Sequence, residues 1–281
     1  MSVLSRNNVR VAGRGLQAIV FAHGFGGDQA LWRFVAPTFE TTHRVVLFDY
    51  VGSGQSDLSA YNATRYGTLQ GYASDLLEVC DALELSQVIF VGHSVSAMIG
   101  MLAATRRPSR FERLVLVAPS PCYVNDAPHY HGGFDRRDLE GFVERMDANY
   151  TEWAGALASM VVGTAEHPHI VAELAASFCN TDPIIARRFA ETAFLSDHRH
   201  DVPLVPVPSL IMQCAQDRIA PEPVGRWLAR QLPRSIYQAL EATGHCPQLT
   251  HPDETIAVIR GYLEAPVGLP TSDRLRVTAS V

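Results

Sequence analysis

One strand-turn-helix segment constrains the fold of this chain more than any other. An apolar, β-branched run at 88–91 leads directly into Gly92-His93-Ser94, and apolar residues at helical spacing follow from Ala97. This order predicts a buried strand, a sharp turn and a helix, with Ser94 at the apex of the turn. A serine in that position has a strained backbone, and its neighbours must be small where chain segments approach closely.

Two interpretations of this turn follow from the residues alone. In the first, Gly92 and Ser96 are the small neighbours of a nucleophile elbow, and the motif is G-x-S-x-S, with Ser96 where a second glycine is usual. In the second, Ser94 is the N-cap of a helix that follows a buried strand. The remainder of the chain distinguishes between them.

Short apolar runs alternate with helical patterns over most of the sequence. This alternation predicts an α/β fold with a mostly parallel, twisted sheet and helices on both faces. The runs that predict strands are 17–22, 44–48, 88–91, 113–118, 209–215 and 235–240. The segments that predict helices are 30–39 (with Leu31, Phe34 and Val35 on one face), 69–83, 222–231 and 253–263. Residues 6–14 predict an edge hairpin that turns at Gly13 and Gly15.

The alternation stops at about Pro119. From 122 to 199 the sequence predicts no strand, and its apolar spacing predicts four helices, at 138–149, 150–162, 168–178 and 182–196. An insertion after the carboxyl end of a strand lies over the crevice where α/β sheets bind ligands, so we expect a helical lid. The predicted parts are a first core part (1–121), the lid (122–199), a second core part (200–264) and a mobile tail (265–281).

Charge and composition exclude several classes of protein. The net charge is −6 with no long basic run, which disfavours nucleic acid as a partner. No apolar run approaches the roughly 20 residues of a membrane span, and residues 1–8 lack the apolar stretch of a secretory signal. The five cysteines are widely spaced without a C-x-x-C motif, which predicts reduced thiols and a cytoplasmic protein.

Two residues that could activate Ser94 follow predicted strands later in the chain. A serine hydroxyl needs a base to accept its proton and a third group to orient that base. Asp217 follows the run 209–215, and His245 follows the last predicted strand, in a G-H-C-P loop. The order Ser, acid, His is typical of a triad at the carboxyl edge of such a sheet. We predict Ser94 as nucleophile, His245 as general base and Asp217 as its orienting acid.

Other roles stay open for several polar residues. Asp217 could instead cap the helix that follows it. Asp49 also follows a strand, but it precedes the serine and opens a glycine loop, which favours a role in stabilising that turn, and Asp197 lies in the lid. His23 and His93 are predicted as hydrogen-bonding structural residues.

An acyl-transfer site also needs two backbone N–H groups aimed at the position where negative charge develops. We predict that one comes from Val95, the residue after the nucleophile. The other is predicted from Phe25 in the loop H-G-F-G-G, because glycines let that loop approach a substrate closely.

No metal or cofactor is predicted. A Ser-His-Asp triad needs no ion, and the H-x-H pairs of the chain have no accompanying acidic cluster. These pairs are His129/His131, His167/His169 and His198/His200. Gly52-x-Gly54 is not a dinucleotide fingerprint, because no helix opens after it.

A larger set of motifs points to one family. They are H-G-F-G-G-D (23–28), V-G-H-S-V-S-A-M-I-G (91–100), R-R-P (106–108), S-P-C-Y-V-N-D (120–126), G-G-F (132–134), N-Y-x-x-W (149–153), F-x-S-D-x-R (194–199) and G-H-C-P (244–247). With them the chain resembles the α/β-hydrolase superfamily over about residues 6–263. It closely resembles the group that contains the bacterial RsbQ-type stress-regulator hydrolase and the plant strigolactone and karrikin receptors. The S-P-C-Y-V-N-D run looks more like the bacterial branch.

The resemblance implies the same triad and a V-shaped four-helix lid over a closed apolar pocket. The lining that it implies is Phe25, Phe134, Trp153, Leu157, Phe189 and Phe194. Packing within the lid is the alternative for each, because aromatic residues at helical spacing pack together in any case. An apolar pocket with few polar groups suits a small hydrophobic ester or lactone.

Two functions are therefore in view. The first is a serine hydrolase that cleaves a small hydrophobic ester or lactone through an acyl-enzyme. The second, implied by the resemblance alone, is a signalling protein that binds and slowly cleaves a small molecule and then engages a protein partner through its lid surface. A lyase or cofactor-free oxygenase on the same fold also stays open. An aspartate-nucleophile dehalogenase or epoxide hydrolase is disfavoured, because the elbow carries serine.

Overall fold

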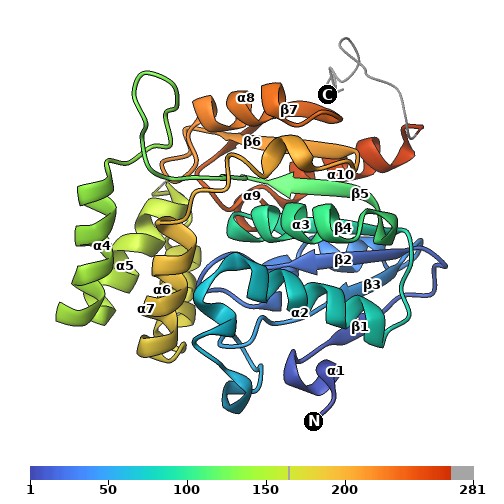
Figure 1. The fold of residues 1–281 in the computed structure, drawn as a ribbon, viewed down its shortest axis with the longest axis horizontal. Helices are drawn as coiled ribbons and strands as arrows, with labels where there is room; N and C mark the ends of the chain where they lie inside the picture. The colour runs from blue at the N-terminus through green and yellow to red at the C-terminus, as the bar shows by residue number, and fades with distance from the viewer. Residues whose placement is uncertain (164, 267–281) are drawn as a thin grey trace.

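A seven-stranded sheet forms the centre of the molecule (Figure 1). The computed structural model describes residues 1–163 and 165–266. The strand order is β1-β3-β2-β4-β5-β6-β7, and every neighbouring pair is parallel except β1 with β3. The bounds are β1 Arg10–Ala12, β2 Ala18–Ala22, β3 Arg44–Leu47, β4 Val88–His93, β5 Phe111–Val117, β6 Ser209–Ala215 and β7 Ser235–Thr243. The mostly parallel α/β sheet predicted from the sequence is thereby confirmed.

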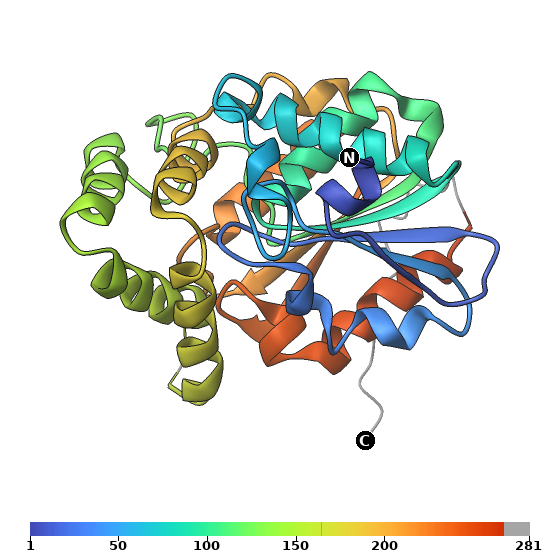
Figure 2. The same cartoon turned by 90° about the horizontal axis from the view of Figure 1, so that it is seen from below.

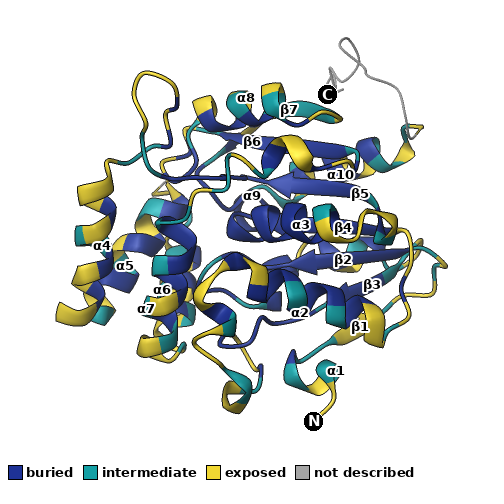
Figure 3. Cartoon of the chain, in the orientation of Figure 1, coloured by how far each residue is buried: buried dark blue, intermediate teal, exposed yellow. Residues whose placement is uncertain are grey.

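Helices cover both faces of the sheet, because strand side chains alternate between two apolar clusters. On β2, Val20 belongs to one cluster, whereas Ile19 and Phe21 belong to the other. The first face is covered by α2 Leu69–Ala82, α3 Val95–Arg106 and α8 Glu222–Gln231, and the second by η1 Gln29–Trp32, η2 Ala36–Phe39 and α10 Pro252–Glu264. Figure 2 shows these two layers on either side of the sheet, and Figure 3 shows how completely the central strands are buried.

Shorter elements join these layers. They are α1 Val3–Arg6, η3 Leu58–Ala60, η4 Arg65–Gly67, η5 Pro108–Arg110, η6 Val202–Leu204 and α9 Pro247–Thr250. None of the helices in the described ranges is long and apolar enough to cross a membrane.

Four helices between β5 and β6 form the predicted lid beside the carboxyl ends of the strands (Figure 1). They are α4 Arg136–Ala148, α5 Tyr150–Val162, α6 Pro168–Cys179 and α7 Pro183–Phe194. Side chains define two of their starts: Asn149 accepts a hydrogen bond from Glu152 N, and Asp182 accepts from Ile184 N and Ile185 N. The apolar faces of these helices form most of a third buried cluster, which also includes Leu31, Ile219 and Leu249 of the core.

The prediction of one helix over 30–39 was wrong. The segment forms two short 3₁₀ helices, η1 and η2, and Phe34 is 46% exposed instead of packing with Leu31 and Val35. Pro37 has no N–H to donate to the preceding turn, so a continuous α-helix cannot form there.

The predicted edge hairpin at 6–14 was also wrong. Residues 10–12 pair with β3, with Arg10 opposite Leu47, and the residues before them form α1. Gly13 and Gly15 allow this segment to pass close to the 40–43 segment, because a Cβ on either glycine would collide with main-chain atoms there. The tail predicted at 265–281 lies outside the described residues from 267 onward.

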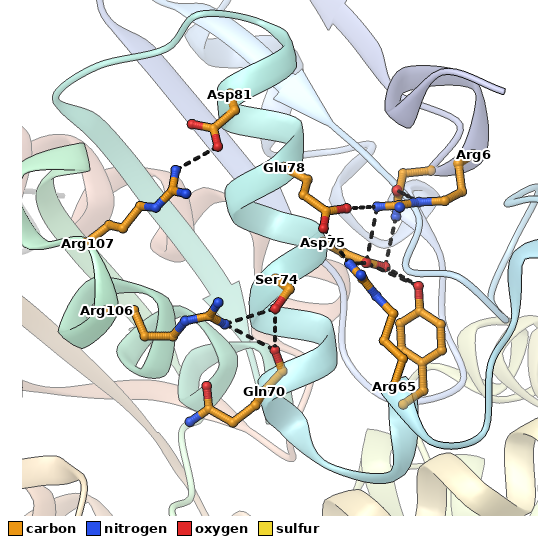
Figure 4. A network of polar contacts seen from close by, with 11 residues as sticks. Arg6, Arg65, Gln70, Ser74, Asp75, Glu78, Asp81, Arg106 and Arg107 are labelled. Atoms are coloured by element: carbon orange, nitrogen blue, oxygen red, sulfur yellow. Dashed lines mark hydrogen bonds and ion pairs between the residues drawn. The ribbon is translucent and has the colours of Figure 1, made fainter.

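A buried carboxylate, Asp75 of α2, ties the N-terminal segment to the core (Figure 4). It accepts hydrogen bonds from Arg6 Nη2 at 3.1 Å, from Arg65 Nη2 at 2.6 Å and from the Tyr66 hydroxyl at 2.9 Å. Glu78, one turn later, contacts the same two guanidinium groups at 2.6 and 2.8 Å. Two carboxylates thus balance two guanidinium groups, which offsets the cost of burying them.

We expect Asp75→Asn to lower the free energy of unfolding by about 3 kcal/mol, because it leaves partly buried guanidinium groups without a matching charge. Urea denaturation measures this loss. Asp81→Asn on the same helix is the matched control: Asp81 also pairs with two arginines, Arg107 and Arg110, but its side chain is 41% exposed. Such exposed pairs contribute about 1 kcal/mol or less, so equal losses in the two variants would contradict the prediction.

Candidate active site

The turn between β4 and α3 places Ser94 at the carboxyl edge of the sheet. Its backbone has φ +57° and ψ −123°, a conformation rarely adopted by a residue other than glycine, and its side chain is buried. Gly92 has no room for a side chain: a Cβ there would lie 2.7 Å from the carbonyl carbon and oxygen of Ser96. The local geometry is therefore the sharp strand-to-helix turn predicted from the sequence.

The serine at position 96 has a structural task that glycine could not perform. Its fully buried hydroxyl donates a hydrogen bond to the His23 carbonyl, at the end of β2, and lies 3.1 Å from the Tyr50 hydroxyl. The His23 ring in turn accepts from Tyr50 N at 3.2 Å and bonds to the Gly24 carbonyl at 2.8 Å. These bonds join the β4–α3 turn to the loop that carries Phe25.

The structure brings Ser94, His245 and Asp217 together. The hydroxyl of Ser94 lies 2.8 Å from His245 Nε2, and His245 Nδ1 lies 2.7 Å from Asp217 Oδ2. All three residues are buried, with exposed fractions of 6%, 3% and 4% in that order. A chain of hydrogen bonds from a serine through an imidazole to a carboxylate can move the serine proton to the ring and stabilise the resulting imidazolium.

The two oxygens of Asp217 have different partners. Oδ2 contacts the His245 ring, while Oδ1 accepts hydrogen bonds from Ile219 N at 2.8 Å and Ala220 N at 3.0 Å. The carboxylate therefore organises its own turn and also faces the imidazole. It does not cap the following helix, because α8 begins at Glu222 after Pro221 and has no side-chain cap.

The other two candidate acids are engaged elsewhere. Asp49 accepts from Gln29 N at 2.9 Å, Asn8 Nδ2 at 2.7 Å and Gln55 N at 3.0 Å, so it joins three loops. Asp197 forms an ion pair with Arg199 at 2.6 Å.

The main chain of His245 is held from two sides. Its N–H donates to the Val161 carbonyl at 2.7 Å, at the carboxyl end of lid helix α5. Its carbonyl accepts from His93 Nε2 at 2.8 Å. Gly244 must be glycine here, because it has φ +80° and a Cβ would collide with the carbonyl of Val162. The imidazole is thus positioned jointly by the lid and by the β4–α3 turn.

The neighbouring His93 is neutral. Burial, with a smaller contribution from His245, lowers the pKa of His93 to about 3. Its Nδ1 has no hydrogen-bond partner among the described residues. It packs so closely on the 23–28 loop that a Cβ on Gly24 would lie 2.5 Å from Nδ1. His93 therefore supports the turn as an uncharged donor.

Sequence reasoning assigned no role to Tyr123, yet its hydroxyl lies 3.4 Å from Ser94 Oγ. Burial raises the pKa of Tyr123 to about 12, so the hydroxyl keeps its proton at neutral pH. The residue stands in the S-P-C-Y-V-N-D motif, but no spacing rule indicates that this loop folds back over Ser94.

The two predicted N–H donors are available. Neither Phe25 N nor Val95 N makes a hydrogen bond to any residue that the structure describes. Val95 begins α3, whose first N–H groups have no partner within the helix.

Ser94 and His245 face a small, mostly apolar cavity beneath the lid. Its walls are Phe25, Leu31, His93, Ser94, Leu157, Val161, Leu174, Phe178, Phe194, Ile219, His245 and Cys246. Phe25, Leu157 and Phe194 belong to the predicted lining. Leu174 and Phe178 were missed: the apolar spacing of α6 marks their face of the helix, but not which side chains reach the cavity.

The other three predicted residues, Phe134, Trp153 and Phe189, are not among the walls. Trp153 and Phe189 pack behind the Phe25 ring, with centroids 6.1 and 5.4 Å from it, and Phe189 also stacks on Tyr72 at 4.4 Å. Phe134 is half-buried against the lid cluster. Trp153 and Phe189 instead pack within the buried clusters of the lid and the core.

The described residues contain no group of three or more His, Cys, Asp or Glu side chains placed to hold a metal ion. One H-x-H histidine, His198, instead bonds to Asp201 at 2.8 Å.

Comparisons with known proteins agree with this geometry. Residues 19–258 match the Alpha/beta hydrolase family. A probable esterase from Oryza sativa subsp. japonica is 41% identical over 260 residues, which cover 92% of this chain and 96% of the relative. A strigolactone esterase from Pisum sativum is 40% identical over 89% of this chain and 94% of its own. A karrikin insensitive 2 receptor from Petunia hybrida is 37% identical over 94% of this chain and 97% of the receptor.

The solved structure of a hydrolase from Oleispira antarctica is also similar, with a TM-score of 0.92, 41% identity, and coverage of 94% of this chain and 97% of that one. The chain belongs to the alpha/beta hydrolase family. Family membership, together with relatives named as esterases and hydrolases, makes it a serine-dependent hydrolase.

We expect acid to destabilise the protein through His93. The unfolded chain binds a proton at this residue below about pH 6.5, whereas the folded protein does so only near pH 3. Between these two values, the free energy of unfolding decreases by about 1.4 kcal/mol for each unit by which the pH is lowered. When the pH is lowered from 7 to 5, the free energy of unfolding of His93→Gln, measured by urea denaturation, should decrease by about 2 kcal/mol less than that of the wild type.

Glutamine keeps an N–H donor at position 93 but does not titrate. The same replacement at His200, whose side chain is 76% exposed, removes one histidine without touching the turn. If the free energies of unfolding of wild type and His93→Gln changed equally with pH, the prediction would be contradicted.

Proposed function

We propose that this hydrolase cleaves a small hydrophobic ester or lactone through an acyl-enzyme on Ser94. The observation that carries the proposal is the pair of hydrogen bonds, 2.8 and 2.7 Å long, that link Ser94 to His245 and His245 to Asp217 at the wall of an apolar cavity. The relatives named as esterases support the same reaction class.

In the first half of the reaction, Ser94 Oγ attacks the substrate carbonyl carbon while His245 Nε2 accepts the hydroxyl proton. The carbonyl oxygen becomes an oxyanion, and the free N–H groups of Phe25 and Val95 stabilise it. When the tetrahedral intermediate collapses, His245 returns the proton to the leaving alcohol, and the acyl group stays bonded to Ser94.

In the second half, His245 accepts a proton from water as that water attacks the acyl-enzyme, and it then returns the proton to Ser94 as the acid product leaves. Asp217 keeps the imidazole in the tautomer with hydrogen on Nδ1 and stabilises the imidazolium in both halves. The hydroxyl of Tyr123, protonated and close to Ser94, can donate to the serine oxygen.

A second function uses the same residues for signalling. One of the similar proteins is named as a receptor, a karrikin insensitive 2 receptor. In this case Ser94 would bind and slowly cleave its ligand, and the lid surface would then bind a protein partner. Turnover distinguishes the two: an enzyme reaches a steady rate, whereas a single-turnover sensor releases one equivalent of product and stalls.

We expect Ser94→Ala to lower kcat on a short-chain nitrophenyl ester by a factor on the order of 10⁶. Steady-state absorbance assays of wild type and variant measure this. Ser209→Ala is the matched control, because Ser209 is also buried, but it begins β6 away from the site and its hydroxyl donates to the Val207 carbonyl. Equal rates in wild type and Ser94→Ala would remove Ser94 from the mechanism.

Asp217→Asn should separate the two roles of that residue. Asparagine keeps an oxygen for Ile219 N and Ala220 N, but it turns an amide N–H₂ toward His245 Nδ1 and favours the wrong imidazole tautomer. We expect kcat to fall by about 10⁴-fold with the melting temperature almost unchanged. A variant that kept full activity would show that Asp217 is only a turn-stabilising residue.

A further inference from the structure

The cavity beside Ser94 is small. Its volume is about 30 Å³, and a water molecule needs roughly 10–15 Å³ of such space. Leu174 and Phe178 of α6 and Leu157 of α5 are among the buried side chains that close it. Only a short acyl chain can therefore fit in this space beneath the packed lid.

A second, larger space lies directly outside. This groove has a volume of about 340 Å³ and runs between α6 and the loops that follow β2 and β3. Leu31 and Leu174 line both the cavity and the groove, so these two side chains form the divider between them. A molecule bonded to Ser94 and longer than the cavity would have to cross this divider.

The two spaces differ in chemistry. The groove carries the polar side chains of Gln55, Asn180 and Thr181, whereas the wall of the cavity is mostly apolar. Two carboxylates, Asp28 and Glu173, also border the groove, and none of its lining residues is basic. Glu173 is paired with Arg33 at 2.7 Å, which leaves Asp28 as the carboxylate without an ion-pair partner among the described residues. The groove therefore suits an uncharged group that forms hydrogen bonds, and it disfavours an anion.

The divider is held in place by contacts between α6 and the Phe25–Gly26 segment. Ser177 Oγ donates to the Gly26 carbonyl at 3.0 Å, and the Phe178 ring packs on Gly26 so closely that a Cβ there would collide with it. Leu174 lies one helical turn before Phe178, on the same side of α6. The position of Leu174 is thus coupled to the loop that supplies the Phe25 N–H.

We propose that the substrate binds across the divider, with a short acyl group in the cavity and an uncharged, hydrogen-bonding alcohol portion in the groove, and that Leu174 sets the acyl length. This inference rests on the proposed ester hydrolysis. The orientation follows from the order of events: the alcohol leaves first and needs a path to solvent, whereas the acyl group stays bonded to Ser94 until water attacks.

The test compares 4-nitrophenyl acetate, butyrate and hexanoate. For the wild type, kcat/KM should fall at least tenfold from acetate to hexanoate. Leu174→Ala joins cavity and groove, so kcat/KM should instead rise toward butyrate by up to about fourfold per methylene, the gain from burying one CH₂ group.

Ile170→Ala is the matched control. Ile170 lies on the same face of α6 and is as deeply buried as Leu174, at 2% exposure each, but it borders neither space. This variant should lose comparable thermal stability and keep the acyl preference of the wild type. If Ile170→Ala accepted longer acyl groups as Leu174→Ala does, general loosening of the lid would explain both results. The proposed role of Leu174 as divider would then be overturned.

A second series varies the alcohol portion. The wild type should hydrolyse the acetate ester of glycerol at least tenfold faster than the acetate ester of lactate, because the carboxylate of lactate would meet Asp28. Equal rates, or greater tolerance for long acyl than for bulky alcohol groups, would overturn the proposed orientation.

These experiments distinguish an error in the proposed divider from an error in the proposed ester hydrolysis. If the wild type hydrolyses the acetate and the acyl profile of Leu174→Ala is unchanged, the divider is wrong and ester hydrolysis stands. If the wild type hydrolyses no ester and a fluorophosphonate probe does not label Ser94, the proposed function fails and the inference fails with it.

Discussion

At Ser94 the backbone adopts φ +57°, a conformation that costs a non-glycine residue about 1–3 kcal/mol, and the surrounding structure has to hold it there. The buried β4 strand fixes one side of the bend, and α3 fixes the other. Gly92 leaves room for the main chain of Ser96, and the hydroxyl of Ser96 joins the bend to the end of β2. One bend therefore sets the position of Ser94 and of the loop carrying Phe25.

The position of the His245 ring depends on the same bend and also on the lid. His93, next to Ser94, donates to the main chain of His245, and Val161 at the end of α5 accepts from it. A rearrangement of α5 that broke the second bond would change the position of the imidazole relative to Ser94. The lid thus helps to hold His245 in place as well as covering the cavity.

Much of this arrangement could be predicted from the sequence, because it depends on local rules. Strand ends at Ser94, Asp217 and His245 must meet at one edge of a parallel sheet, and apolar spacing was enough to place the lid helices. The lining of the cavity was less predictable. Trp153 and Leu157 lie one turn apart on α5, yet only Leu157 reaches the cavity, because neighbouring elements decide which side chain does.

The cavity lining depends on packing between elements, and for this reason membership of the family does not by itself determine the substrate. In the proposed reaction, the bend, the hydrogen-bond chain and the free N–H groups act on the carbonyl group, which every ester or lactone shares. Discrimination between substrates must come from the volumes on either side of that carbonyl. Here those volumes are about 30 and 340 Å³ and meet at Leu31 and Leu174. Small changes in the packing of α6 would therefore alter substrate choice while leaving the reaction chemistry intact.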